Sequence, residues 1–255
     1  MKTGYFATTI GEMYYRYNEI QSENILVCIH GAGGDSRQFI PLMNALQTIA
    51  VYAVDLPGHG KSAINECSLD IYVQAMQQFI GSLNGNVFVL GHSMGGGIIF
   101  ELVQRNALIA GALFLATAGK LPVNPVVFDL LDKDFDGLCK LAVDLSYGAI
   151  DDTMRKTAIE CMKQAGSNVL KNDFTLCDGY NYDETAAQFP FTSCFIANRK
   201  DTMVPLDYIY ATFKKMPDAM LQVLPYKGHM SHIEQVHQVA ACINHFIELT
   251  KSKNF

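Results

Sequence analysis

Short apolar runs alternate along this chain with segments whose apolar residues recur at helical spacing. A run such as Asn24–His30, which stops at Gly31, is typical of a strand buried on both faces of a sheet. The alternation predicts an α/β protein with a mostly parallel, doubly wound sheet of about eight strands, because parallel strands need helical crossovers. The predicted strands are Tyr5–Ile10, Met13–Tyr17, Asn24–His30, Ile49–Asp55, Asn86–Leu90, Ile109–Ala116, Phe191–Ala197 and Met220–Leu224. The predicted helices of this core are Ser36–Leu46, Leu69–Leu83, Met94–Arg105, Leu206–Lys215 and His232–Leu249.

The alternation stops between Gly119 and Pro190. Only helices are predicted in this segment, namely Pro125–Asp132, Phe135–Ser146, Asp152–Gln164 and Asn168–Tyr180. Strand patterns then resume, so the segment is interpreted as an insertion in one domain. We therefore expect a core formed by residues 1–118 and 191–255, with a helical cap at 119–190. A length of 255 residues is within the range of a single α/β domain.

Charge and composition exclude several classes of protein. The net charge of -6 offers no basic surface for phosphate backbones, so nucleic acid is not expected as a partner. The most apolar stretch, Ala107–Ala118, is much shorter than the roughly 20 residues that cross a bilayer, so no membrane span is expected. The N-terminus lacks the apolar core of a secretory signal, and the seven cysteines lack C-x-x-C spacing. These features favour a cytoplasmic protein with buried thiols.

The strongest motif is Gly91-His-Ser-Met-Gly95, a G-x-S-x-G between a predicted buried strand and a predicted helix. In this context the serine occupies a strained turn at the carboxyl end of the strand, and the flanking glycines remove side chains that would clash there. Ser93 is therefore the candidate nucleophile. The alternative is a glycine-rich turn in which Ser93 only caps the helix.

A serine hydroxyl needs a base and an orienting carboxylate, and both occur later in the chain. Asp201 follows the first strand after the cap, and His229 follows the last strand, which brings both to the same edge of a parallel sheet. Taken alone, Asp201 is more typical of a turn or a helix cap, and its occurrence in the order Ser, Asp, His favours the catalytic interpretation instead. The other candidate acid, Asp207, falls in the next predicted helix.

Three further histidines, His232, His237 and His245, lie in or near the last predicted helix and are interpreted as surface or packing residues. The spacing of His229, His232 and His237 raises the alternative of a metal site. We expect no metal, since no cysteine or acidic cluster completes a ligand set.

An oxyanion needs two backbone N–H donors. The loop His30-Gly-Ala-Gly-Gly-Asp35 offers the N–H of Ala32, and the residue after the nucleophile offers the N–H of Met94. The alternative, a phosphate-binding loop, lacks both G-x-G-x-x-G and the terminal Lys-Ser/Thr of a P-loop. His59, in the Pro/Gly turn at 55–62, is interpreted as a structural loop residue.

Together, the motifs HGAGGD (30–35), DLPGHGKS (55–62), GHSMGG (91–96), NRKDTMVP (198–205) and KGHMSHIE (227–234) resemble those of the α/β-hydrolase superfamily. The resemblance covers nearly the whole chain outside the cap. It implies Ser93 as nucleophile, Asp201 as acid, His229 as base, Ala32 and Met94 as oxyanion donors, and no cofactor. Within the superfamily the chain is similar to small cytoplasmic carboxylesterases, carbon–carbon bond hydrolases and lactonases with a four-helix cap.

The leading hypothesis is a serine hydrolase that cleaves a small carboxylic ester through an acyl-enzyme. The first alternative is carbon–carbon bond or lactone cleavage by the same triad, and the second is a ligand-binding homologue with slow turnover. A cap over the nucleophile would line the substrate pocket, and the apolar candidates for this lining are Val126, Val127, Phe128, Leu130 and Phe174. Cap-to-core packing is the other role open to them. The oligomeric state is left open.

Overall fold

The computed structural model describes residues 1–64, 66–105 and 107–253. Its strands form one sheet in the order β1-β2-β4-β3-β5-β6-β7-β8. The pairs β1–β2 and β2–β4 are antiparallel, and all other neighbouring pairs are parallel. The strands are β1 (Lys2–Thr8), β2 (Gly11–Tyr17), β3 (Asn24–Ile29), β4 (Ala50–Val54), β5 (Asn86–His92), β6 (Gly111–Leu115), β7 (Ser193–Asn198) and β8 (Ala219–Leu224). The predicted eight-stranded, mostly parallel α/β sheet is confirmed.

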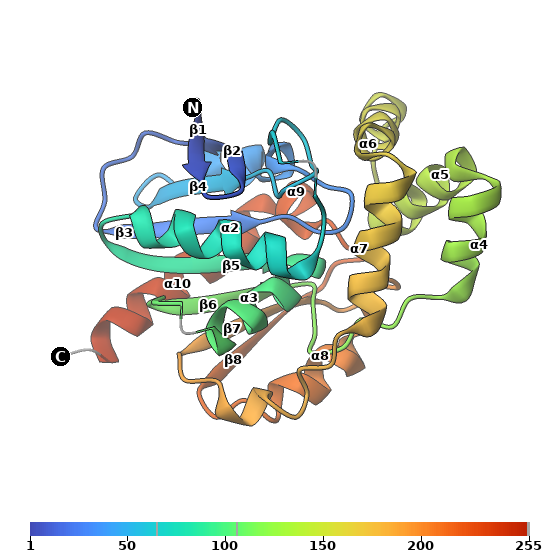
Figure 1. Ribbon diagram of the computed structural model, residues 1–255. Coiled ribbons are helices and arrows are strands. Elements are labelled where there is room, and N and C mark those ends of the chain that lie inside the picture. Colours follow the sequence, from blue (N-terminus) through green and yellow to red (C-terminus); the bar gives the residue numbers. More distant parts are fainter. Residues whose placement is uncertain (65, 106, 254–255) are drawn as a thin grey trace.

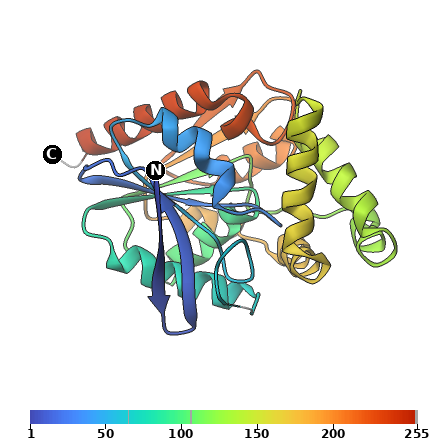
Figure 2. The ribbon, with the colours of Figure 1, turned by 90° about the horizontal axis from the view of Figure 1, so that it is seen from above.

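Helices cover both faces of this sheet, which gives three layers (Figures 1 and 2). One face carries α2 and α3, and the other carries α1 and α10. The core helices are α1 (Ile40–Ala45), α2 (Leu69–Ser82), α3 (Met94–Gln104), α8 (Leu206–Phe213), α9 (Ser231–Glu234) and α10 (Val236–Lys253). Two short 3₁₀ turns are η1 (Ser36–Phe39) and η2 (Ala186–Gln188). No helix in the described ranges is both long and apolar enough to span a membrane.

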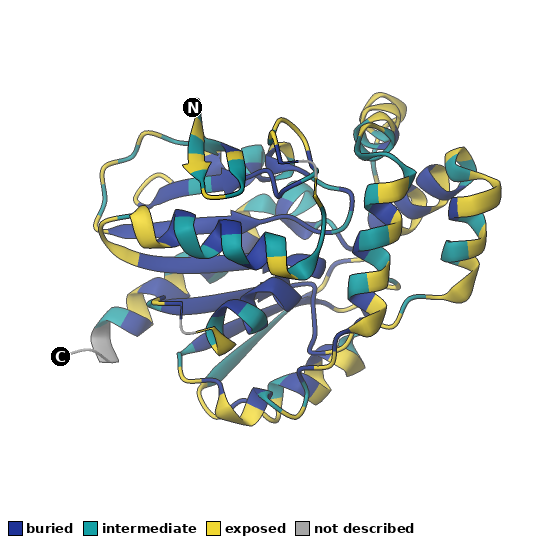
Figure 3. Cartoon of the chain, in the orientation of Figure 1, coloured by how far each residue is buried: buried dark blue, intermediate teal, exposed yellow. Residues whose placement is uncertain are grey.

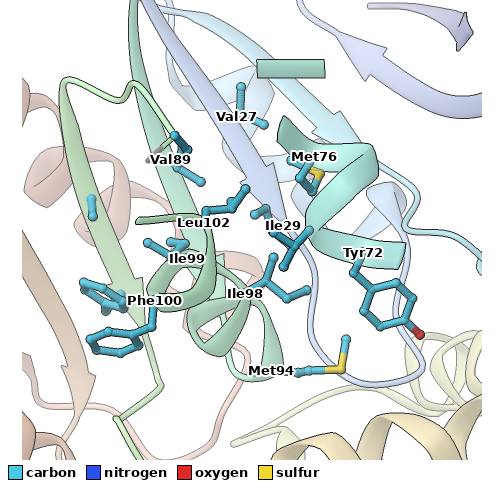
Figure 4. Close-up of a cluster of buried hydrophobic side chains, with 14 of the residues drawn as sticks. Val27, Ile29, Tyr72, Met76, Val89, Met94, Ile98, Ile99, Phe100 and Leu102 are labelled. Carbon is cyan, nitrogen blue, oxygen red and sulfur yellow. The ribbon is translucent and has the colours of Figure 1, made fainter. Parts of the chain in front are cut away.

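The period of two along each central strand divides the core between the two faces of the sheet. Val27 and Ile29 of β3 pack with α2 and α3, where Figure 4 shows them beside Met76 and Ile98. Leu26 and Cys28 of β3 pack on the opposite face against α1 and α10. Each side chain of this size that is fully buried contributes about 1.5 to 3 kcal/mol, so burial on both faces strongly specifies the strand register.

Two predicted helices are each divided in the structure. The predicted helix at 36–46 is a 3₁₀ turn, η1, followed by α1, whose first turn contains Pro41. Proline lacks the N–H that would continue a helix and is accepted at the start of a new one. The predicted helix at 232–249 is the short α9 followed by α10, with a break at Gln235.

Four helices lie between β6 and β7, beyond the carboxyl ends of the parallel strands (Figure 1). They are α4 (Pro125–Lys133), α5 (Phe135–Ser146), α6 (Asp152–Ala165) and α7 (Ser167–Gly179), called here the inserted helices. Leu131, Leu138 and Leu170 form a buried cluster among them. Their outer faces are exposed, whereas the central strands are almost wholly buried (Figure 3).

Candidate functional site

Ser93 lies on a strained turn between β5 and α3. Its backbone has φ 52° and ψ -120°, a region that residues other than glycine rarely adopt. A Cβ atom on Gly91 would lie 2.3 Å from the carbonyl oxygen of Gly95, and one on Gly95 would lie 2.5 Å from that of Ile29. Only glycine fits both positions, so the local sequence holds Ser93 at the carboxyl end of a central strand.

Asp201 and His229 form a buried pair in the loops that follow β7 and β8. The Nδ1 atom of His229 lies 2.7 Å from Oδ2 of Asp201. The other carboxylate oxygen, Oδ1, accepts hydrogen bonds from the N–H groups of Met203 at 2.9 Å and Val204 at 3.1 Å. These contacts fix the carboxylate, so that the ring is oriented from its Nδ1 side and its Nε2 side remains for other chemistry.

The backbone of His229 is held by an inserted helix. The carbonyl oxygen of Ser146, the last residue of α5, accepts hydrogen bonds from the N–H groups of His229 at 2.5 Å and Met230 at 3.1 Å. A Cβ atom on Gly148 would lie 1.9 Å from the carbonyl oxygen of Lys227, so the backbones of these two segments are in direct contact. The inserted helices therefore help to place the histidine loop.

The loop after β3 runs beside Ser93. A Cβ atom on Gly31 would lie 3.0 Å from Cβ of Ser93. The N–H of Gly34 donates to the carbonyl oxygen of Gly31 and that of Gly33 donates to Asp173, whereas the N–H of Ala32 has no partner among the described residues. Met94 is the first residue of α3, where backbone N–H groups have no partner within the helix.

A pocket of about 640 Å³ joins these elements to the inserted helices. Its core side contains Ala32, Ser93 and His229, and the rest of its wall is largely apolar. The apolar lining includes Leu121, Val123, Val127, Val143, Leu145, Met154, Ala158, Met162, Phe174, Val204 and Ile233. Apart from histidines, the charged residues among its described lining are Asp35 and Arg37, whose side chains are paired at 2.6 Å. The volume is within the range of small-molecule sites.

The structure divides the five residues predicted to line the pocket. Val127 and Phe174 are part of its wall. Val126 is 52% exposed, and Phe128 and Leu130 pack against the buried cluster of the inserted helices. Val126, Val127 and Phe128 are consecutive residues of α4, so their side chains point about 100° apart around the helix, and only the tertiary arrangement decides which of them faces the pocket.

Asp173 is a buried acid that the sequence motifs do not single out. It lies in α7, is 0% exposed, and bonds to His59 and to the loop after β3. One signal in the sequence points to it, since Leu170, Asp173 and Cys177 share the i, i+3, i+7 spacing of an apolar helix face. An acid on such a face needs a buried partner.

The three histidines near the C-terminus lie in different environments. His232 is fully buried, whereas His237 and His245 are exposed. In the described part of the chain, no group of three His, Cys, Asp or Glu side chains is placed to hold a metal ion. Neither ring nitrogen of His232 has a described hydrogen-bond partner, and burial together with the nearby His229 lowers its pKa to about 3.

Replacing His232 with leucine is expected to reduce the acid sensitivity of the fold. Because the folded-state pKa of His232 lies below that of the unfolded chain, the unfolded state binds its proton first as the pH falls. The resulting loss of stability is absent above the unfolded pKa and grows below it, to roughly 2 kcal/mol at about pH 5. Urea unfolding of the parent and of His232→Leu at about pH 8 and about pH 5 measures the difference.

The free energy of unfolding of His232→Leu, minus that of the parent, should be larger by that amount at about pH 5 than at about pH 8. His237→Leu removes an exposed histidine and should show no such change. An equal pH dependence in parent and His232→Leu would contradict the buried neutral state of His232.

Comparison with known proteins shows the family of the chain. The model of the Alpha/beta hydrolase family matches residues 26–242. The bifunctional biotin biosynthesis protein BioHC of Teredinibacter turnerae is 24% identical over 261 residues, which cover 90% of this chain and 45% of that protein. The pimeloyl-[acyl-carrier protein] methyl ester esterase of Stenotrophomonas maltophilia is 23% identical over 240 residues, covering 87% of this chain and 92% of that protein.

Among solved structures, a thermophilic esterase superposes with a TM-score of 0.88 at 22% identity, covering 98% of each chain. At this identity the likeness shows the fold. This chain spans only 34% to 65% of the length of three of the curated relatives that it matches. The family match nevertheless covers most of the chain, from β3 into α10. The chain therefore belongs to the alpha/beta hydrolase family.

Proposed function

We propose that this protein is a serine hydrolase that cleaves a small, uncharged carboxylic ester, with residues 119–190 acting as a cap over the site. The observation that carries the proposal is that Ser93, on its strained turn, and His229, paired with Asp201, line one pocket. The family of the chain supports hydrolysis. The similarity to the methyl ester esterase of Stenotrophomonas maltophilia supports an ester as the bond that is cleaved.

In the proposed reaction, Ser93 Oγ attacks the ester carbonyl carbon while its proton passes to Nε2 of His229. Asp201 holds the Nδ1–H of His229 and stabilises the imidazolium that forms. The carbonyl oxygen becomes an oxyanion, which the N–H groups of Ala32 and Met94 stabilise. When the tetrahedral intermediate collapses, the ester C–O bond breaks and the alcohol leaves with the proton from His229. Water then repeats the cycle on the acyl-enzyme and releases the acid.

The pocket wall favours an uncharged substrate. Its lining is mostly apolar, and its charged side chains, Asp35 and Arg37, are bonded to each other. A carboxylate carried into such a pocket would lose its hydration without gaining a free cation. Each methylene that becomes buried contributes about 0.8 kcal/mol, so short acyl chains should gain affinity as they lengthen.

The test combines covalent labelling with an ester panel. A fluorophosphonate should add one adduct, which peptide mass mapping locates at Ser93. Against nitrophenyl esters, kcat/KM should rise about tenfold from acetate to butyrate, since two methylenes are added. For the hemisuccinate, whose chain ends in a carboxylate, kcat/KM should be at least about tenfold below that of butyrate.

Ser231→Ala is the matched control for labelling at Ser93. It removes the hydroxyl of a buried serine near His229, and this hydroxyl has no described hydrogen-bond partner. An adduct at any other residue would refute Ser93 as the nucleophile. Labelling without turnover of any ester would refute ester cleavage and direct the search to carbon–carbon and lactone substrates. Hemisuccinate turnover equal to that of butyrate would refute the preference for uncharged esters.

A further inference from the structure

A buried carboxylate joins the inserted helices to the core. Asp173, in the middle of α7, is 0% exposed and accepts three hydrogen bonds from three separate elements. Its Oδ2 accepts from the N–H of Gly33 at 2.9 Å and lies 2.9 Å from Nε2 of His59, and its Oδ1 accepts from the hydroxyl of Tyr72 at 2.8 Å. Gly33 belongs to the loop after β3, His59 to the loop after β4, and Tyr72 to α2.

His59 faces this carboxylate as a charged imidazolium. Its Nδ1 lies 2.9 Å from the carbonyl oxygen of Pro57 and its Nε2 lies 2.9 Å from Oδ2 of Asp173. Both partners are hydrogen-bond acceptors, so both ring nitrogens carry a proton. The pKa of His59 is raised, because the charge and hydrogen bond of Asp173, with the bond to Pro57 and the charge of Asp55, outweigh the opposing effect of burial.

The neighbouring His30 is neutral by the same reasoning. Its Nδ1 lies 2.8 Å from the carbonyl oxygen of Gly31, whereas its Nε2 accepts from the N–H of Leu56. Burial and the nearby charge of His59 lower the pKa of His30 to about 4. Of these two histidines, His59 therefore carries the positive charge, and it pairs with Asp173 in a setting where either charge alone would be costly.

The shape of α7 matches the two loops that it joins. A Cβ atom on Gly33 would lie 2.7 Å from Cδ1 of Leu170, one turn before Asp173. Gly33 also has φ 62°, so glycine is needed there both for the backbone and for the contact. A Cβ atom on Gly58 would lie 3.8 Å from Val169, the residue before Leu170. One face of α7 thus rests on both loops.

We propose that Asp173 is a positioning residue that holds the loop of Gly31 to Gly34, and with it the N–H of Ala32, in the orientation needed to stabilise the oxyanion. This inference rests on the proposed function. Gly33 directly follows Ala32, so the hydrogen bond from Gly33 to Asp173 restricts rotation of the adjacent peptide. Docking of α7 through Asp173 therefore completes the site, in addition to covering it.

The size of the effect follows from the geometry of oxyanion stabilisation. Loss of one oxyanion donor typically lowers kcat by about 100- to 1,000-fold, and a displacement of about 1 Å in an active site can cost about 100-fold. A donor that is loosened and not removed should cost less than a lost one. We therefore expect a decrease in kcat of about 10- to 100-fold when the carboxylate is replaced by an amide.

The test variant is Asp173→Asn, and the matched control is Asp132→Asn. An amide has a single acceptor oxygen, so it cannot satisfy all three donors and offers no charge to His59. Asp132 is an exposed acid of α4 that pairs with Lys171 of α7, so the control also removes a carboxylate that contacts α7, but at the surface.

For each variant we would measure kcat and KM for nitrophenyl butyrate, with active sites counted by fluorophosphonate. Affinity for a phenylethyl boronic acid, which forms a tetrahedral adduct with the serine, and hydrogen exchange over residues 31–35 complete the set. Asp173→Asn should show the decrease in kcat with KM within about threefold, a matching loss of boronic acid affinity, and faster exchange. Asp132→Asn should behave as the parent.

Tyr72→Phe provides a second variant that removes one donor and keeps the aromatic ring. Its kcat and its affinity for the boronic acid should fall together, by about three- to tenfold. If Asp173→Asn is not recovered folded, unchanged values in Tyr72→Phe overturn the proposal.

A folded Asp173→Asn with lower thermal stability but unchanged kcat per active site would show a purely structural role and overturn the proposal. In that case the parent's turnover would leave the proposed function standing. A parent that shows no turnover dependent on Ser93 would refute the proposed function and the positioning role together.

Discussion

Ser93→Ala is expected to lower kcat for nitrophenyl butyrate by about 10⁶-fold, because no acyl-enzyme forms without the hydroxyl nucleophile. The substitution removes one oxygen from a turn whose shape depends on Gly91 and Gly95, not on the serine side chain. The fold and the pocket should therefore remain, and KM should change little. Any residual rate reflects stabilisation of the oxyanion by backbone N–H groups acting on attack by water.

The measurement is a steady-state assay with sensitivity to the uncatalysed rate, together with the thermal unfolding midpoint of each variant. Ser231→Ala, the control for covalent labelling, should retain the activity of the parent. A Ser93→Ala protein that keeps more than about one hundredth of the parental kcat would exclude the proposed acyl-enzyme.

Asp201→Asn is expected to lower kcat by about 10⁴-fold, through the tautomer of His229. The amide oxygen can replace Oδ1 as acceptor for the N–H groups of Met203 and Val204. The amide NH₂ then faces Nδ1 of His229 and donates to it. With Nδ1 as an acceptor, the neutral ring carries its proton on Nε2 and cannot take the proton of Ser93.

The same assay measures this effect, with KM and the rate of fluorophosphonate labelling recorded alongside kcat. KM should be close to that of the parent, and labelling should slow together with turnover. Asp207→Asn is the matched control, because it changes an exposed acid six residues later. Equal losses in the two variants, or a loss below about tenfold in Asp201→Asn, would show that Asp201 does not act through His229.

The main elements of the core were predictable because each depends on local pattern. The continuous apolar run of β3 predicts a strand, because a strand buried on both faces needs apolar residues throughout. The helical period of the apolar residues in α2 predicts an amphipathic helix. The turn at Ser93 was predictable for a similar reason. Gly91 and Gly95 stand where a side chain would meet backbone atoms, so the motif and its strained geometry imply each other.

Local pattern did not decide a residue's role where that role depends on a partner distant in the sequence. Val126, Val127 and Phe128 are adjacent apolar residues, yet only Val127 is part of the pocket wall. Asp173 and His59 lie 114 residues apart and bond to each other. Nothing local to either residue indicates that contact, because it exists only after α7 has docked on the loops after β3 and β4.

The sequence by itself determined the order of strands and helices along the chain, including the four consecutive helices between β6 and β7, because each element has its own hydrophobic periodicity. It also determined the strained turn of Ser93, because the flanking glycines mark a close backbone approach. It also identified Asp201 and His229 as candidates, because the carboxyl ends of parallel strands share one edge of a sheet. Only the tertiary structure decided which faces of the inserted helices line the pocket and which residues form hydrogen bonds with Asp173. Helix packing sets those contacts, and packing depends on the shapes of all the surfaces that meet.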